Sequence, residues 1–195
     1  NNGDGNIYEC VLNGSEWSEP KKMSGNINSN FHESAASYSP DEKTLYFVSD
    51  RTKGSFGKHD IYKSTLGSNG KWGEAENLGP SISTIGDEIA VYMHPDGKTL
   101  YFASDGHRTM GGFDIFKSVF ENGRWSPAKN IGYPINSSDD DIDFVLGASG
   151  RHGYMSSSKG KGFGEKDIYL LTFLGTRKVS LAPVSYTHLT LPTRS

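Results

Sequence analysis

Short apolar stretches alternate along the chain with turns rich in glycine, proline, asparagine and aspartate. Residues 99–104, Thr-Leu-Tyr-Phe-Ala-Ser, are typical, since β-branched and aromatic residues dominate and a Pro-Asp-Gly turn precedes them. No window keeps an apolar face at helical spacing for three turns. The pattern therefore predicts an all-β chain built from short strands.

These strands recur in a fixed order, which is the strongest signal in the sequence. Residues 39–50, Ser-Pro-Asp-Glu-Lys-Thr-Leu-Tyr-Phe-Val-Ser-Asp, return at 94–105 as His-Pro-Asp-Gly-Lys-Thr-Leu-Tyr-Phe-Ala-Ser-Asp, and a weaker copy covers 149–158. An Asp-Ile-Tyr or Asp-Ile-Phe block follows each copy, and an Asn-Gly turn with a tryptophan follows the first two. Four antiparallel strands in every 53–55 residues predict blades of a partial β-propeller.

The residue types suit the places that a blade would give them. The first strand of a blade is the innermost, so Ala35, Ala36 and Ala90 are expected where blades crowd together at the axis. The Tyr-Phe pairs at 46–47 and 101–102 are expected to fill the layers between neighbouring blades. A single blade cannot bury both faces alone, so each repeat needs its neighbours.

Composition narrows the functional classes. The net charge of −3 and the pI near 6.1 argue against a surface that binds duplex nucleic acid, which normally carries a basic excess. No apolar run approaches the roughly 20 residues that span a bilayer. Cys10 is the only cysteine, which excludes a disulfide framework and a multi-cysteine zinc site.

At these repeats the chain resembles the WD40-like Pro-Asp propeller repeat of the TolB kind. The resemblance rests on the Pro-Asp turns, the Leu-Tyr-Phe strands and the Gly-Gly-Phe-Asp-Ile-Phe segment at 111–116, and it covers residues 1–174. The third copy departs from it, because Ser149-Gly150 replaces Pro-Asp and Ser158 replaces the aspartate. The resemblance implies that these positions maintain the repeat: Pro40, Asp41, Asp50, Asp60, Trp72, Pro95, Asp96, Asp105, Asp114, Trp125 and Asp167.

The repeats also resemble those of large envelope proteins of Bacteroidota-type bacteria, in which a propeller precedes an OmpA-type peptidoglycan-binding domain. This implies a periplasmic, outer-membrane-associated, non-enzymatic module that binds or scaffolds protein or peptidoglycan-associated partners, without a cofactor. One alternative is the gating domain of a prolyl-oligopeptidase-like serine hydrolase whose catalytic domain is missing. A carbohydrate lyase or glycosidase propeller is a third possibility, and it would need paired carboxylates facing one cleft.

The repeat boundaries divide the chain into five segments. We expect the third and fourth strands of a preceding blade, two complete blades, an incomplete blade and a tail, at residues 1–31, 32–86, 87–139, 140–178 and 179–195. The last 12 residues, 184–195, resemble translated sequencing-adapter DNA and are expected to be non-native. About three blades are fewer than a closed propeller needs, so a fragment is expected.

One carboxylate recurs at the start of the first strand of each blade. Glu33, Glu88 and Asp141 align there, and the entry to the innermost strand lies near the mouth of a propeller channel. We therefore expect an acidic ring at the mouth that contacts partners. The acidic run at 139–143 would also suit a hard cation, although it lacks calcium-loop spacing, so cation binding, partner contact and turn capping all stay open.

A second repeated carboxylate precedes the third strand of each blade. Asp60, Asp114 and Asp167 follow glycine-rich loops, and a short carboxylate in that place accepts backbone N–H bonds. We expect these residues to hold the loops.

No catalytic motif emerges. Gly97-Lys98-Thr99 lacks the upstream glycine of a phosphate loop, and residues 147–150 miss the last glycine of a nucleophile elbow. None of the six histidines pairs at metal-ligand spacing. The glycine-rich stretch at 160–164 is interpreted as an inter-strand loop, with contact to an anionic polymer as the alternative. We expect neither a metal site nor an active site.

Overall fold

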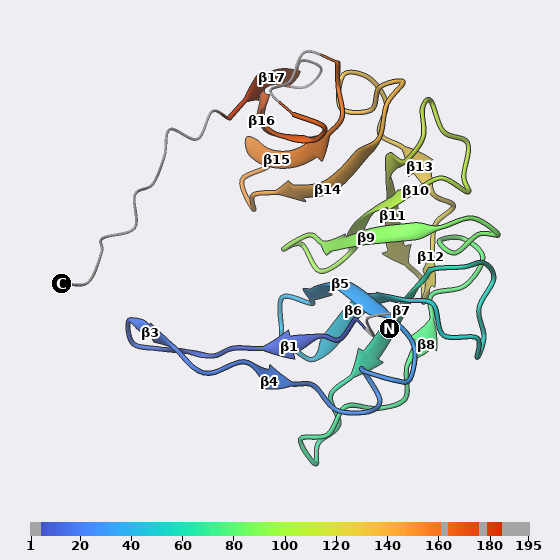
Figure 1. Cartoon of the computed structure of the whole chain (residues 1–195), viewed down its shortest axis with the longest axis vertical. Coiled ribbons are helices and arrows are strands. Elements are labelled where there is room, and N and C mark those ends of the chain that lie inside the picture. Colours follow the sequence, from blue (N-terminus) through green and yellow to red (C-terminus); the bar gives the residue numbers. More distant parts are fainter. Residues whose placement is uncertain (1–4, 161–163, 176–178, 185–195) are drawn as a thin grey trace.

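The fold is all-β, as the sequence pattern predicts. The computed structural model describes residues 5–160, 164–175 and 179–184, and every regular element in these residues is a β-strand. Three antiparallel sheets are stacked side by side as an arc around a common axis (Figure 1). The strands recur in sequence order across each sheet, which is the arrangement of propeller blades.

Each sheet is one repeat of the sequence. The first blade contains β5 (Glu33–Tyr38), β6 (Thr44–Ser49), β7 (Asp60–Thr65) and β8 (Glu76–Asn77). The second contains β9 (Glu88–Met93), β10 (Thr99–Ser104), β11 (Asp114–Glu121), β12 (Arg124–Trp125) and β13 (Lys129–Asn130). The third contains β14 (Asp141–Leu146), β15 (His152–Ser157), β16 (Asp167–Phe173) and β17 (Val179–Pro183).

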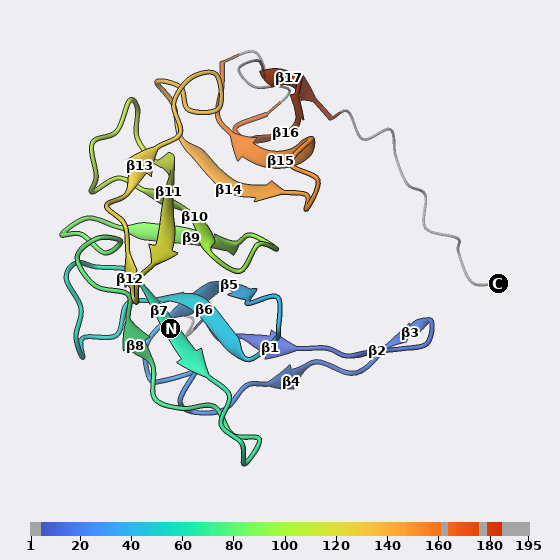
Figure 2. The same cartoon turned by 180° about the vertical axis from the view of Figure 1, so that it is seen from behind.

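The N-terminal residues form an arm that repeats only the outer half of a blade. Its strands are β1 (Tyr8–Glu9), β2 (Leu12–Asn13), β3 (Glu16–Trp17) and β4 (Lys21–Lys22). The N–H of Met23 donates to the carbonyl of Ile7 at 3.1 Å, as the N–H of Leu78 donates to Ile61 at 3.0 Å in the first blade. The arm therefore has the pairing of third and fourth strands, and it projects beside the first blade in both views (Figures 1 and 2).

The last blade extends beyond its expected boundary. Residues 179–183, which we expected in the tail, form β17 and pair with β16 from Tyr169 to Phe173. This segment carries neither the Asn-Gly turn nor the tryptophan of the other fourth strands, so the repeat pattern gave no sign of it. The segment that resembles adapter sequence, except residue 184, lies outside the described residues.

The core consists of apolar layers between neighbouring blades. Alternate residues of a strand point to opposite faces, so Leu100 and Phe102 pack toward the first blade while Tyr101 and Ala103 pack toward the third. Trp125 of the second blade lies edge-on to Tyr46 of the first, with ring centroids 6.2 Å apart. The aromatic residues thus lie between the blades, as the repeat predicted.

The alanines of the first strand are only partly where we expected them. The innermost strands β5, β9 and β14 are neighbours, and Ala90 is buried, but Ala35 and Ala36 are exposed. The three blades form an arc (Figure 1), and Ala35 and Ala36 line a hollow of about 220 Å³ together with residues of β9, β10 and β14. A β-bulge interrupts the pairing of β5 with β6 at this point, and Ala35 has a φ of +26°.

Turns between the first and second strands use the predicted Pro-Asp chemistry. In the second blade, Asp96 accepts the N–H groups of Lys98 and Thr99, both at 2.8 Å, which lowers the pKa of this carboxyl against the opposing effect of burial. In the first blade, Asp41 accepts the N–H of Lys43 at 3.2 Å. These turns fix one end of each blade, and the loops that precede β5, β9 and β14 lie at the other.

Candidate partner-binding rim and the carboxylates beneath it

The three carboxylates that we expected at an exposed channel mouth are buried. Glu33 is 2% exposed, and Glu88 and Asp141 are 0% exposed, at the first residues of β5, β9 and β14. The expectation of an acidic ring facing partners is therefore corrected. These side chains point into the framework, where the chain itself supplies their hydrogen-bond donors.

Each carboxylate closes the loop that leads into its own strand. In the second blade, Glu88 accepts the N–H of Thr84 at 3.0 Å and the Thr84 hydroxyl at 2.8 Å. It also accepts the hydroxyl of Ser104, at the end of the paired strand, at 2.7 Å. The same three bonds join Glu33 to Ser29 and Ser49, and Asp141 to Ser137 and Ser157. A buried carboxylate that accepts several hydrogen bonds fixes the conformation of the loop that donates them.

A basic side chain completes this arrangement in the first blade. Arg51 Nη2 lies 3.1 Å from Glu33 and donates to the carbonyl of Ile27 at 2.6 Å. The guanidinium lies over the rings of Phe47 and Tyr62, 5.0 and 5.1 Å from their centroids. The cation is held by an ion pair, a carbonyl and two aromatic faces, so the buried charge of Glu33 is compensated.

The third blade builds the same site with a lysine. Lys159 Nζ lies 3.1 Å from Asp141, donates to the carbonyl of Ile135 at 2.6 Å and lies 5.6 Å from the centroid of the Tyr169 ring. Arg51 and Lys159 occupy equivalent positions, two residues after the serine that ends the second strand. Two of the three junctions therefore pair the buried carboxylate with a cation.

The second blade lacks this cation. Gly106 occupies the equivalent position, and a Cβ placed there would come within 1.7 Å of the Thr84 hydroxyl. The neighbouring residue His107 takes over the aromatic site instead, because its Nε2 lies 2.8 Å from the carbonyl of Ile82 and its ring packs 5.0 Å from that of Phe116. Only hydrogen bonds remain for Glu88 among the described residues.

The missing cation changes the acid–base behaviour of Glu88. Burial raises the pKa of this carboxyl from 4.5 to about 7, against the lowering effect of the bonds from Ser104 and Thr84, and the negative charge of Asp60 raises it further. Near neutral pH, Glu88 is therefore divided between its protonated and charged forms. Its protonation state is tied to the folding of the junction between the first two blades.

Two of the three carboxylates at the start of the third strands hold loops, as expected. Asp60 is buried and accepts the N–H of Phe56 at 2.7 Å and the amide of Asn77 at 3.2 Å. Asp114 binds the N–H of Met110 at 2.5 Å and the amide of Asn130 at 2.6 Å. Asp167, the third member, is half-buried at the start of β16 and lies opposite Ser157 in register.

Two further aspartates tie the loops to the blades. Asp50 accepts the N–H of His32 and Asp105 accepts the N–H of Asp87, each at 2.7 Å. In the third blade Ser158 replaces this aspartate, and among the described residues it keeps the backbone bond from its N–H to the Asp140 carbonyl, at 3.0 Å, without a side-chain bond. The departure seen in the sequence therefore removes one side-chain bond without removing the strand pairing.

These contacts assemble the loops into one surface, which we call the rim. It comprises residues 29–32, 50–59, 84–87, 105–113 and 137–140. A Cβ on Gly57 would come within 2.4 Å of the Thr84 carbonyl, and one on Gly111 within 2.5 Å of the Asp139 carbonyl. Loops of neighbouring blades thus touch backbone to backbone, which only glycine permits. The rim loops of the first two blades lie on the right of Figure 1.

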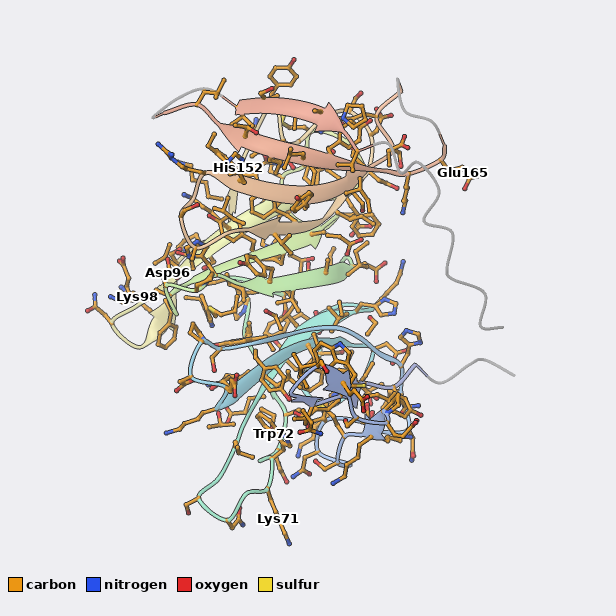
Figure 3. The ribbon with its side chains drawn as sticks, turned by 90° about the vertical axis from the view of Figure 1, so that its left-hand side faces the viewer. Lys71, Trp72, Asp96, Lys98, His152 and Glu165 are labelled. Carbon is orange, nitrogen blue, oxygen red and sulfur yellow. The ribbon has the colours of Figure 1, made fainter. Side chains whose placement is uncertain are left out.

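The rim exposes apolar side chains on this fixed backbone. Phe56 is 46% exposed, Ile85 87%, Met110 52% and Phe31 38%. The turn between β9 and β10, with Asp96 and Lys98, lies at the opposite edge of the molecule from Glu165, which belongs to the loop before β16 (Figure 3). Exposed apolar residues gathered on ordered loops are typical of a surface that binds another macromolecule.

Solved structures share this architecture. A TolB-type protein from Agrobacterium tumefaciens is 21% identical, and the alignment covers 92% of this chain and 57% of that protein, with a TM-score of 0.58. The chain has a TolB-like β-propeller fold. It spans little more than half the length of this structural neighbour. No protein-family model and no curated protein matches the sequence.

Two further neighbours are weaker. TolB from Acinetobacter baumannii is 16% identical, with 86% of this chain and 47% of that protein covered and a TM-score of 0.46. A protein described as a 6-phosphogluconolactonase from Bacteroides uniformis is 16% identical, with 91% and 50% covered and a TM-score of 0.47. At TM-scores below 0.5, their functions have no bearing on this chain.

The acidic run of the TolB-like third blade does not converge on one point. Asp140 accepts the N–H of Phe113 at 3.1 Å, and Asp143 accepts the Ser156 hydroxyl at 3.1 Å, while Asp141 is buried below. Among the described residues no three His, Cys, Asp or Glu side chains gather as metal ligands, and no helix is long and apolar enough to cross a bilayer. Asp140 thus holds the loop before β11 and Asp143 joins β14 to β15, while cation binding and partner contact by this run stay predictions.

Sequence reasoning missed the rim itself. Its apolar residues lie in glycine-rich loops, which the repeat pattern marks only as connections. The available signal was an apolar residue flanked by polar residues and glycine in a loop, as at Phe56 and Met110. A side chain in such a loop is not covered by neighbouring side chains of a sheet.

Proposed function

We propose that this chain is part of a non-enzymatic propeller module of the bacterial envelope that docks protein partners on the rim. The observation that carries the proposal is the set of exposed apolar side chains on loops that buried carboxylates hold in place. A rigid binding surface loses little conformational entropy when a partner binds, so even a small apolar set contributes usefully to affinity.

In this arrangement the residues that hold the loops differ from those that would contact a partner. Asp60 and Asp114 bind the amide groups of Phe56 and Met110, so each apolar side chain projects from a residue whose backbone is anchored. Loop sequences differ between blades while the anchors repeat, and a repeated scaffold with variable loops is well suited to recognition.

The location in the envelope is supported by the resemblance of the Pro-Asp repeats to those of periplasmic, outer-membrane-associated proteins. On this proposal the complete protein continues into an OmpA-type domain that binds peptidoglycan, while the rim remains free to bind a protein. The propeller then acts as a spacer and docking platform between the cell wall and its partner.

Site-specific photo-crosslinking tests this function. A photo-crosslinking residue is placed at Phe56 on the rim or, as the matched control, at Lys98 on the opposite edge. Each protein is incubated with periplasmic and outer-membrane extracts and with cytosolic extract of a Bacteroidota bacterium. We expect discrete adducts from Phe56 with the envelope extracts. Equal adducts from Lys98, adducts from the cytosolic extract alone, or no adduct would contradict the proposal.

A further inference from the structure

A second surface feature, outside the rim, is a groove between the N-terminal arm and the first blade. It has a volume of about 550 Å³, and Lys21 and Lys22 of β4 line one side while Lys71 and Trp72 line the other. Figure 3 shows Lys71 at the tip of the hairpin and Trp72 nearer the sheet. Two elements far apart in the sequence therefore build this groove.

The aromatic wall of the groove is fixed in position. The amide of Asn26 donates to the carbonyl of Trp72 at 2.6 Å, which ties the hairpin to the segment after the arm. The Trp72 ring packs against Tyr38, with centroids 6.0 Å apart and planes at 41°. The tryptophan is thus half-buried by packing, and it still lines the groove.

The groove is positively charged although the whole chain has a net charge of −3. Lys21, Lys22 and Lys71 are exposed, and within the described ranges none of them forms an ion pair. The one acidic residue in the lining, Glu9, accepts the Tyr38 hydroxyl at 2.6 Å. Lys21 opposes Glu9 across the strand pair and shares its face, so Lys21 and Lys71 bring ammonium groups to the groove from its two sides. These charges create a local field that attracts anions.

The repeat itself does not require this charge. The equivalent groove of the second blade has a volume of about 460 Å³ and contains Trp125, but its charged residues are one arginine, Arg124, and one glutamate, Glu121. Both tryptophans support the packing of their blades, and Lys71 corresponds to Arg124. Lys21 and Lys22 have no basic counterpart, because Glu76 and Asn77 occupy their positions in the first blade. The charge of the first groove therefore calls for an explanation other than folding.

We propose that this groove binds an acidic saccharide, with a sugar ring against Trp72 and its carboxylates at the lysines. A flat aromatic surface among ammonium, hydroxyl and amide groups matches a ring that carries both C–H faces and polar substituents. Lysine ammonium groups serve as point charges for carboxylates. An acidic peptide such as hexaglutamate carries the carboxylates but has no ring face to place against the single aromatic wall of the groove. This site lies outside the rim and goes beyond the proposed docking function.

Calorimetric titration of the full chain at low salt tests the proposal. The probes are a galacturonate hexamer, its methyl ester, which has the same rings without charge, and a hexaglutamate peptide. We expect saturable binding of the hexamer with a Kd below about 1 mM and at least tenfold weaker binding of the ester and the peptide. No saturable binding of the hexamer, or equal binding of the ester or the peptide, would overturn it.

Substitutions then locate the site. The double variant Lys21→Gln with Lys71→Gln removes two exposed charges without touching the core, and we expect it to weaken hexamer binding about tenfold. Arg124→Gln in the second groove is the matched control and should leave the affinity unchanged. Phe56→Ser on the rim should also leave it unchanged, so failure here is distinguishable from failure of the docking function. Equal loss with Arg124→Gln would contradict the assignment.

Discussion

The backbone N–H of Gly106 and the carboxylate of Glu88 bond to the same hydroxyl, that of Ser104, at 3.0 and 2.7 Å. In the neighbouring blades the residue equivalent to Gly106 is Arg51 or Lys159, and each brings a cation to the buried carboxylate. Within the part of the chain that the structure describes, the middle blade therefore buries its carboxylate with hydrogen bonds and no cation. We therefore expect pH and substitutions to change the stability of the protein mainly through this junction between the first and second blades.

Stability should depend on pH through Glu88. Its pKa rises from 4.5 to about 7 on folding, so the folded state holds this proton more tightly than the unfolded chain. The stability gained from protonation is fully present below pH 4.5 and is lost as the pH rises through about 7. Relative to Glu88→Gln, which does not titrate, the wild type should lose about 3 kcal/mol across this range.

Urea unfolding of both proteins between pH 4.5 and 8 measures the difference. Titration of the other groups is shared by the two proteins, so it cancels in the comparison. Parallel stability curves for the wild type and Glu88→Gln would show that Glu88 keeps an ordinary pKa.

Gly106→Ala should destabilise the protein. The new Cβ would meet the Thr84 hydroxyl at 1.7 Å, so Thr84 must move and its bond to Glu88 is lost. We expect a loss of about 2 kcal/mol, seen as a lower thermal midpoint. Gly160→Ala is the control, since its Cβ meets nothing within 4 Å. Equal midpoints for the two variants would contradict the close approach at Gly106.

The sequence predicted the framework well because the framework is periodic. The alternation of Leu-Tyr-Phe residues determines which side chains enter each layer, so the pattern alone assigns Phe102 and Tyr101 to opposite faces of their strand. The sequence did not predict β17, because its residues carry no strand motif and the strand is stabilised by its pairing with β16. A strand without turn or aromatic signals is defined by its partner.

The burial of the carboxylates could not be read from the repeat alone. Glu88 looks like a surface residue until the threonine four residues earlier and the serine on the paired strand are seen to donate to it. The alignment of the repeats also shows Arg51, Gly106 and Lys159 at one position, but only the fold reveals that this position faces the carboxylate. The burial of these carboxylates depends on contacts between strands, which the sequence of one repeat does not show.

The middle junction has a second weak point at Ser83. Its hydroxyl is buried, and within the described residues it has no hydrogen-bond partner. The equivalent Asn136 bonds to both the N–H and the carbonyl of Ile115, each at 2.8 Å. Ser83→Ala should therefore be neutral or stabilise the protein by up to about 1 kcal/mol, while Asn136→Ala should cost about 2 kcal/mol.

Chemical denaturation measures the free energy of unfolding of these two variants. They can be compared directly, because both truncate a buried side chain at equivalent places. The opposite order, with Ser83→Ala the more harmful, would mean that the Ser83 hydroxyl has a partner that the contacts do not show.

Amide hydrogen exchange in the rim loops tests most directly whether the buried carboxylates hold those loops in one arrangement. The N–H groups of Phe56 and Met110 bond to Asp60 and Asp114, and that of Thr84 bonds to Glu88. We expect these amides to exchange as slowly as those of the adjoining strands. Exchange at the rate of an unstructured chain would contradict a preformed rim and the docking function built on it.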